Sequence, residues 1–595
     1  MKLVDHKDLE FAYQQGNYRE ILDSIETIGY TNENSDYFYY YIGSSIELGK
    51  LNKVEFLLNQ YEPRSITPEN VIIWHLLKGK YYNALNEFNL AITELELALK
   101  FCPKKKKSII RAEINIQLAY ALRGIKKYYL AIDIAQQAYF GMITINHIPT
   151  MAQTYNILGL LHIDIKDFNK ARNYLKEALL HFEEINNKHY KAITLFYLSL
   201  LFQKQNQYQE AVYLGERAFD LFQKSENMYN IVCSSISLGE IYFSLNQPLR
   251  AGQHLKNAQI LAEKIGNYPY VAQALMYLGK VVKNQRKYKE SLQYLHKALT
   301  LLELNDEPEI LAKTLYNLGI IFSIQNNYEE ALQVFNRSLR LRERIGDQES
   351  IARTLLKISD VKFHSGMKNE ALQILTDIRI ILAPSKNIRL KLINLFQNCK
   401  FRYLMNILDS NFLLIDDNLK LDDPNNAEII SKYQIALKGM YNIHLNNKYD
   451  AEFLLKECLN FNNFDLDAFN FINKLLTKMY LENWNSSEST NDFQKLIEHL
   501  DIWEEFCKKE NLGDTLVILC LIRGRISIIR NNLKDAERRL VQCSITSEEM
   551  GLPILKNEID EELTFLIENR EIIGNQINSS YYKLCVQKIN HLLSY

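Results

Sequence analysis

The fold is decided by the stretch at residues 152–187, AQTYNILGLLHIDIKDFNKARNYLKEALLHFEEINN. Apolar residues recur at helical spacing in its first half, as at Ile157 and Leu161, and again in its second half, from Ala171 to Phe182. A short polar turn at Lys166-Asp167 separates the two halves. The stretch therefore predicts two amphipathic helices that fold back on each other as a hairpin.

The same pattern returns every 40 residues from Ile72 to Ile378 without insertion or deletion. Each unit has one small residue in its first helix and two more, mostly Ala, twelve and nineteen residues later. The first column consists of Gly79, Ala119, Gly159, Ser199, Gly239, Gly279, Gly319 and Ser359. Small residues at a fixed spacing mark places where two helices approach closely, so the period predicts a stack of helical hairpins.

These columns resemble the tetratricopeptide repeat, in which a small residue on helix A is followed by Ala twice on helix B. The usual repeat is about 34 residues long. The 40-residue unit here is similar to the longer-helix variety in kinesin light chains, cell-polarity adaptors and sensor domains of bacterial regulators. Asn317-Leu318-Gly319, Tyr328, Ala331 and Gly346-Asp347 carry the resemblance best. It implies an all-α fold, a right-handed α-solenoid (superhelix) of antiparallel helical hairpins.

Three regions are predicted along the chain. Capping helical hairpins occupy residues 1–70, the eight-unit array spans 71–384, and an irregular helical region covers 385–595. The small-residue spacing returns twice in the last region, which predicts further hairpins near 430–465 and 513–552.

Two polar segments outside the array, 416–426 and Asn483–Asn491, are predicted to be surface connections. Asn or Gly residues at Asn146, Asn186, Gly266 and Gly346 are expected to end helices as C-caps. The run Lys104–Lys107 is interpreted as the solvated end of a helix B rather than a phosphate site.

Composition excludes several classes of function. The 595 residues include 70 basic and 71 acidic side chains, a net charge of -1, which gives no global field for nonspecific nucleic-acid binding. Neither a signal peptide nor a run of about 18 apolar residues is found. We expect a soluble cytoplasmic protein that binds neither nucleic acid nor membrane.

Catalytic and metal-binding motifs are absent from the sequence. It has no Gly-x-Gly-x-x-Gly, phosphate-binding loop, His-Glu-x-x-His or Gly-x-Ser-x-Gly. The 12 histidines are scattered, and the 8 cysteines form no Cys-x-x-Cys pair, so buried free thiols are expected. We expect a non-enzymatic protein without cofactor or metal.

The resemblance implies a concave groove lined by helix A, with an apolar and aromatic middle and polar edges. Carried residue by residue onto this chain, it points to Asn156, Phe196, Lys204, Glu240, Phe243, Lys280, Lys283, Lys313, Tyr316, Asn317, Arg353, Lys357 and Asp360 as partner-binding residues. The alternative for the phenylalanines is that they pack between the helices.

Charge in the later units predicts the partner's character. The inward cations there are Lys280, Lys283, Lys313, Arg353 and Lys357, with Asp360 the one nearby inward acid. We therefore expect a protein or peptide segment with acidic residues flanking an apolar anchor.

A carboxylate clamp of the kind found in chaperone-binding members is matched in part. Asn317, Arg353 and Lys357 fit its second and third units, whereas Met276 and Lys280 depart from its first.

Two functions follow from the sequence. The first is a scaffold or adaptor that binds a partner segment along the concave groove. The alternative is a regulatory protein that senses a peptide or small ligand, and an enzyme with a site in the C-terminal region ranks below both.

Overall fold

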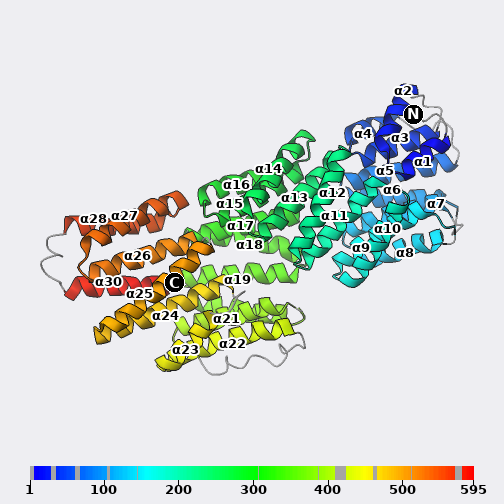
Figure 1. Ribbon diagram of the computed structural model, residues 1–595. Coiled ribbons are helices and arrows are strands. Elements are labelled where there is room, and N and C mark those ends of the chain that lie inside the picture. The colour runs from blue at the N-terminus through cyan, green and yellow to red at the C-terminus, as the bar shows by residue number, and fades with distance from the viewer. Residues whose placement is uncertain are drawn as a thin grey trace. The chain divides into compact units, whose positions relative to one another are not determined.

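The chain forms two compact units, residues 1–277 (unit 1) and 278–595 (unit 2). The computed structural model describes residues 6–28, 35–60, 68–103, 108–143, 145–305, 307–385, 387–408, 424–459, 465–510, 512–569 and 579–594. These residues form helices joined by short turns, as Figure 1 shows.

Unit 1 is a stack of antiparallel helical hairpins in which each helix from α1 to α13 packs against the next along the chain. Its helices are α1 (His6–Gln14), α2 (Tyr18–Ile28), α3 (Ser35–Glu47), α4 (Leu51–Gln60), α5 (Pro68–Ala84), α6 (Phe88–Phe101), α7 (Ile109–Gly124), α8 (Tyr128–Ile143), α9 (Ile148–Asp164), α10 (Phe168–Glu184), α11 (Lys188–Lys204), α12 (Tyr208–Lys224), α13 (Met228–Ser244) and α14 (Pro248–Lys264), followed by α15 (Tyr268–Asn284), which runs into unit 2.

Unit 2 continues the pattern with α16 (Tyr288–Glu303), α17 (Pro308–Ile324), α18 (Tyr328–Ile345), α19 (Gln348–His364), α20 (Lys368–Leu382), α21 (Ile388–Leu404), α22 (Pro424–His444), α23 (Lys448–Leu459), α24 (Leu466–Ser487), α25 (Thr490–Lys509), α26 (Gly513–Ile529), α27 (Leu533–Met550), α28 (Pro553–Glu568) and α30 (Ser579–Ser594). Helix α30 packs against α24 and α26. The α22–α23 and α26–α27 pairs lie at the two places where the sequence predicts hairpins. The predicted all-α solenoid of antiparallel hairpins is confirmed.

At the described turns between Asn86 and Gly366 the chain reverses direction through one left-handed residue, and these residues are spaced by 20 or 40 positions. Positive φ values, from 51° at Asn146 to 93° at Gly366, occur at Asn86, Lys126, Asn146, Lys166, Asn186, Asn206, Glu226, Asn246, Gly266, Arg286, Asn326, Gly346 and Gly366. Gly and Asn adopt this conformation most readily, which explains their frequency here. The four residues expected as C-caps all have the left-handed conformation: Gly346 is the C-cap of α18, and Asn186 and Gly266 directly follow the C-caps of α10 and α14. Regular spacing keeps successive helices in register.

The small-residue columns lie where helix A meets helix B. A methyl group built on Gly319 would come within 2.6 Å of the Phe335 ring. Ala331 and Ser338 in the other two columns are fully buried. A similar clash, within 2.8 Å of the Leu sixteen residues later, would occur at Gly79, Gly159, Gly239, Gly279 and Gly439. Close helix contact is therefore the reason for the period.

The polar segment Asn483–Asn491 is not a loop, so that prediction is wrong. Helix α24 extends to Ser487 and α25 begins at Thr490, with Ser489 as its N-cap. The polar residues lie on exposed helix ends, where composition resembles that of a loop. Lys104–Lys107 and residues 416–423 lie outside the described residues.

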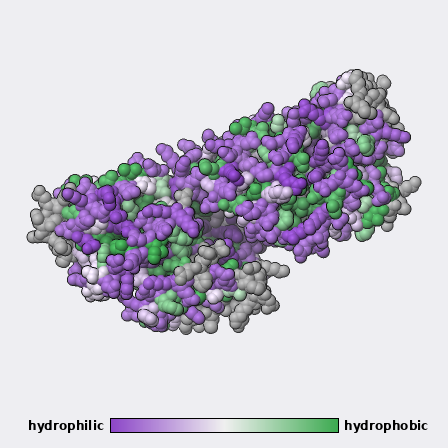
Figure 2. Space-filling view, in the orientation of Figure 1, coloured by the Kyte–Doolittle hydropathy of each residue, from purple (hydrophilic) through white to green (hydrophobic). Residues whose placement is uncertain are grey.

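The surface shown in Figure 2 is predominantly hydrophilic, with hydrophobic residues scattered between polar ones. Among the described residues, no helix combines the length and the apolar character needed to cross a membrane. The same part of the chain contains no cluster of three or more His, Cys, Asp or Glu side chains suited to a metal ion. All eight cysteines are free thiols.

Replacing Gly319 with Ala should destabilise the protein by about 1–3 kcal/mol, because the added methyl group forces the buried Phe335 ring to move. Gly252 on α14 is the control, since nothing lies within 4 Å of a methyl group added there. Gly252→Ala should stabilise its helix by roughly 0.8–1 kcal/mol through helix propensity alone. Thermal melts followed by circular dichroism compare the two. A Gly319→Ala variant that melts at or above the wild-type temperature would contradict the packing described here.

Candidate functional site

The A helices of unit 1 line a partly open cavity of about 220 Å³. Its walls come mainly from α3, α5, α7, α9, α11 and α13, the first helices of successive hairpins, with Leu51 of α4 added. Polar side chains that line it include Glu47, Lys80, Asn83, Gln117, Asn156, His189, Tyr190 and Asn227. A polar cavity formed by six consecutive hairpins is a candidate binding site.

Two asparagines in this cavity have one polar atom each without a hydrogen-bond partner among the described residues. Asn83 Nδ2 donates to the Gln117 carbonyl oxygen at 2.9 Å, which leaves Asn83 Oδ1 unpaired. Thr194 Oγ1 donates to Asn156 Oδ1 at 2.9 Å, which leaves Asn156 Nδ2 unpaired. Both asparagines are buried, and a buried polar atom without a partner costs about 1–3 kcal/mol. Each asparagine that lines the cavity therefore keeps one buried polar atom, an acceptor in Asn83 and a donor in Asn156, without a partner among the described residues.

Glu47 and Lys80 of the cavity, in contrast, already lie close to partners, whereas the buried Nδ1 atom of His189 has none among the described residues. Tyr190 donates to Glu47 Oε1 at 3.0 Å, and His189 Nε2 lies 3.3 Å from Glu47 Oε2. Burial alone would raise the pKa of Glu47, but the hydrogen bond from His189 and the nearby positive charges hold it below its usual value. Lys80 Nζ lies 3.6 Å from Glu113 Oε2, and negative charge there outweighs burial and raises the Lys80 pKa.

Asn187 and Asn227, which we call the clasp asparagines, join distant hairpins of unit 1. The Oδ1 atom of each accepts from a backbone N–H at the start of α11 or α13, at 2.9 Å in both cases. The Nδ2 atoms donate to the carbonyl oxygens of Gln14, at 2.7 Å, and Glu47. One side chain therefore caps a helix and also holds a turn more than 170 residues earlier in the chain.

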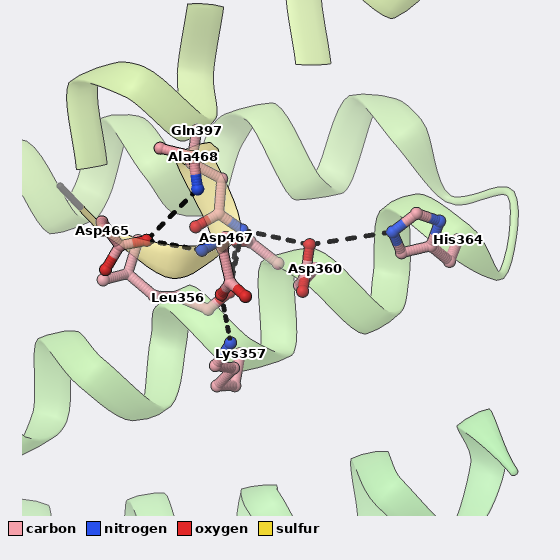
Figure 3. A network of polar contacts seen from close by, with 9 residues as sticks. Leu356, Lys357, Asp360, His364, Gln397, Asp465, Asp467 and Ala468 are labelled. Carbon is pink, nitrogen blue, oxygen red and sulfur yellow. Dashed lines mark hydrogen bonds and ion pairs between the residues drawn. The ribbon is translucent and has the colours of Figure 1, made fainter. Parts of the chain in front are cut away.

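Unit 2 contains a polar network between α19, α21 and α24, shown in Figure 3. Lys357 Nζ lies 3.3 Å from Asp467 Oδ2, and the charge of each partner shifts the other's pKa, upward for Lys357 and downward for Asp467. Gln397 donates to Asp360 Oδ1 at 3.4 Å, and His364 Nε2 lies 3.8 Å from the same oxygen. The Asp467 side chain is 79% exposed, so this ion pair faces water and contributes about 1 kcal/mol or less.

Comparison with family models identifies the hairpins. Residues 150–224 and 310–379 match one tetratricopeptide repeat model, and residues 271–303 match another. The chain contains tetratricopeptide repeats. A comparison with curated proteins finds no match.

Several solved structures share the helical-repeat architecture. A Rap protein complexed with competence and sporulation factor is 18% identical, with a TM-score of 0.45 over 57% of this chain and 97% of its own. Aspartyl phosphate phosphatase F from Bacillus subtilis is 16% identical, with a TM-score of 0.39 over 56% and 92%. Nearly identical TPR-like repeats of a putative kinesin light chain from Podosopora anserina are 16% identical, with a TM-score of 0.27 over 33% and 98%. At TM-scores this low, the similarities carry no argument about function.

The residues predicted for the groove of unit 1 have different surroundings in the structure. Asn156 lines the cavity of the tetratricopeptide stack. Phe196 lies against the rings of Tyr197 on its own helix and Phe222 on the B helix α12. Phe243 is partly buried, and Lys204 is exposed at the end of α11. Glu240 on α13 interacts with Tyr277, whose pKa is raised by burial and by this carboxylate.

The residues predicted for the groove of unit 2 also have different surroundings. Lys357 and Asp360 belong to the network of Figure 3, whereas Lys313 and Arg353 are exposed. Asn317 Nδ2 donates to the Lys313 carbonyl oxygen at 2.9 Å. The Arg342 guanidinium lies 4.5 Å from the centre of the Tyr316 ring. Because Lys357 already holds the chain's own Asp467 carboxylate, the suggested carboxylate clamp is not open to a partner at that residue.

Sequence reasoning missed the N-terminal part of the cavity. The set of inward helix A positions that includes Asn156 in the third unit also applies to the first two units. There it includes Lys80, Asn83 and Tyr120, and all three residues line the cavity. The repeat register therefore contained this signal. It contained no signal for Glu47 and His189, which lie 142 residues apart and meet close to the bond of Asn227 with the Glu47 carbonyl oxygen.

Replacing Asn227 with Asp should loosen the capping hairpins, because an aspartate still caps α13 but cannot donate to the Glu47 carbonyl oxygen. Losing a buried hydrogen bond of this kind costs about 1–3 kcal/mol, so amide hydrogen exchange in α1–α4 should accelerate roughly tenfold or more. Asn267 is the matched control, since its Oδ1 accepts from the Tyr270 N–H at 3.2 Å at the same place in the next repeat. Exchange in α1–α4 that is equal in Asn227→Asp and Asn267→Asp would contradict the clasp.

Proposed function

We propose that unit 1 binds an extended segment of a partner protein along the inner face of its A helices and acts as a non-enzymatic scaffold or adaptor. The free acceptor at Asn83 Oδ1 and the free donor at Asn156 Nδ2 support this most strongly. An extended backbone carries both N–H and C=O groups, so a bound segment can offer a donor to Asn83 and an acceptor to Asn156.

The size and lining of the cavity also favour a peptide segment. Its volume of about 220 Å³ lies below the roughly 300–1,000 Å³ of ordinary small-molecule pockets. Ile193, Tyr120, Tyr197 and Tyr229 provide apolar and aromatic surface for one side-chain anchor. Burial raises the pKa of Tyr120 and Tyr197, so both rings stay neutral at physiological pH.

The acidic character expected for the partner stays a prediction, as does a cytoplasmic location. In unit 2, Lys357 has a carboxylate from the chain itself, so the amide-lined cavity of unit 1 is the better place for the partner's backbone. The charged groups of that cavity are engaged with one another, which favours a segment whose contacting residues are neutral.

A displayed library of random peptides, selected on the full-length protein, tests the proposal. Selected peptides should bind the Asn83→Ala/Asn156→Ala variant roughly tenfold or more weakly, because two buried hydrogen bonds are lost. Asn89→Ala/Asn173→Ala is the matched control, since both asparagines are exposed on B helices. Fluorescence anisotropy measures the affinities. Selected peptides that bind both double variants as tightly as wild type would place binding elsewhere on the chain.

Ligand sensing is a second candidate function, favoured by one observation. The clasp residue Asn227 and its neighbours Glu47 and His189 line the same cavity. A segment bound there would touch the groups that hold the capping hairpins in place, so binding could change their stability.

Hydrogen exchange distinguishes sensing from plain scaffolding. If unit 1 is a sensor, a peptide bound in the cavity should slow or accelerate exchange in α1–α4 severalfold, since it acts on the clasp. The comparison uses saturating peptide with wild type and with Asn83→Ala/Asn156→Ala. Binding that leaves exchange in α1–α4 unchanged would contradict sensing while leaving the scaffold proposal in place.

A further inference from the structure

Unit 2 contains a cavity of about 470 Å³ between α25, α26 and α27. This volume lies within the roughly 300–1,000 Å³ of ordinary small-molecule pockets, unlike that of the cavity in unit 1. None of its lining residues belongs to the polar network of Figure 3 or to the groove expected from the sequence. The cavity is therefore a separate candidate site.

Three side chains of the cavity wall are apolar. Phe493 and Ile497 lie about one helical turn apart on α25, and Ile526 belongs to α26. The centre of the Trp484 ring lies 4.9 Å from that of Phe493, and this contact helps to hold the Phe493 ring in place. The wall thus offers apolar surface to part of a ligand.

Arg530 is the one arginine of the wall without a counter-ion among the described residues. It is the C-cap of α26, and its guanidinium carbon lies over the Phe493 ring, 4.4 Å from the ring centre. A guanidinium on an aromatic face is held in one orientation while its N–H groups stay available. The C-terminal end of α26 favours a cation there, but only through the partial charge of its carbonyl groups.

The other two arginines of the wall are paired and still have unused donors. Arg539 Nε donates to Asp535 Oδ2 at 2.8 Å, and Arg523 Nη2 donates to Asp501 Oδ1 at 2.5 Å. Arg523 Nε is buried without a hydrogen bond, because Glu504 Oε2, 3.0 Å away, does not lie along its N–H. Since a guanidinium carries about five N–H donors, each pair leaves some of them available to a ligand.

Asp535 is the one carboxylate of the cavity wall, and several donors already bind it. Ser527 Oγ donates to its Oδ2 at 2.7 Å, and Arg538 Nη2 donates to its Oδ1 at 2.6 Å, in addition to the bond from Arg539. Burial alone would raise the Asp535 pKa, but the hydrogen bonds from Arg539 and Ser527 lower it to about 2. Asp535 therefore stays ionised and offsets its own arginines rather than Arg530.

The wall and its ion pairs have one positive charge in excess among the described residues. The arginines are Arg523, Arg530, Arg538 and Arg539, and the carboxylates are Asp501, Glu504 and Asp535. One further carboxylate would balance these charges. A phosphate dianion would exceed the balance and would leave the apolar part of the wall without a partner.

We propose that the cavity between α25, α26 and α27 binds a small organic acid in which one carboxylate is joined to an apolar body. The carboxylate accepts from Arg530, which a guanidinium can achieve with two parallel hydrogen bonds. The apolar body packs against Phe493, Ile497 and Ile526. The site lies within unit 2 and does not depend on the function proposed for unit 1.

Titration of the full-length protein, labelled at its isoleucine methyl groups, with 3-phenylpropionate and separately with hexanoate tests the site by NMR. Each acid should bind saturably and shift the methyl signals of Ile497 and Ile526, but not that of Ile358 on α19, which does not line the cavity. The primary amide of each acid should bind roughly tenfold more weakly, because it cannot form a charge-assisted pair with Arg530.

The two acids also distinguish the kind of apolar body. Tighter binding of 3-phenylpropionate would support an acid with an aromatic body, and tighter binding of hexanoate an aliphatic one. Absence of saturable shifts at Ile497 and Ile526 with both acids would overturn the proposal. Amides that bind as tightly as their acids would overturn it as well.

The variant Arg530→Gln should bind the acids roughly tenfold or more weakly and bind the amides like wild type, since only the charge-assisted pair is lost. Arg344→Gln is the matched control, because Arg344 on α18 is likewise exposed and has no ion pair or hydrogen bond among the described residues. Both variants should melt like wild type, as exposed charges contribute little to stability. Equal affinity of the two variants for the acids would overturn the proposal.

Discussion

Close contact between helix A and helix B at one small residue per hairpin is the constraint on which both units depend. At Gly319 the Phe335 side chain occupies the space that a methyl group would need, and Gly159 and Gly239 meet a leucine in the same way. Left-handed turn residues spaced by 20 or 40 positions then deliver each new helix to the same place. Because these two features fix the backbone, the inward side chains of the A helices are free to vary.

Contacts between distant hairpins add a second level of organisation. In a simple solenoid each repeat contacts only its neighbours. In unit 1 the clasp asparagines bind turns of the capping hairpins, and in unit 2 Gln325 Nε2 donates to the Gly551 carbonyl oxygen at 2.8 Å. Such bonds make the unfolding of one hairpin costly for another far along the chain. We therefore expect each unit to unfold more cooperatively than a row of independent repeats.

How much the sequence could predict depends on the distance between interacting residues. Pairs such as Gly319 and Phe335, sixteen residues apart, follow directly from the repeat. The contact of Lys357 with Asp467, 110 residues later, depends on how far the superhelix advances with each hairpin, which the small-residue columns do not state.

The dependence of long-range contacts on the advance of the superhelix also explains the errors at the candidate sites. Asp360 was predicted to be the one inward acid near the lysines, yet α24 and α26 bring Asp467 and Asp514 to the same surface. Asn156 was found because it lies inside the regular array, whereas Glu47 and His189 meet across a turn of the superhelix. Local periodicity predicts the hairpins well and their long-range partners poorly.

The inner face of unit 1 includes a polar side chain that does not help the hairpins to pack. An apolar residue in place of Asn83 would avoid an unpaired buried oxygen. Asn83 therefore lowers stability relative to an apolar residue at the same position. Departures from stability of this kind are expected where a ligand supplies the missing partner. Unit 1 lacks partners for neutral amide atoms, so a ligand that completes it must offer neutral hydrogen-bonding groups.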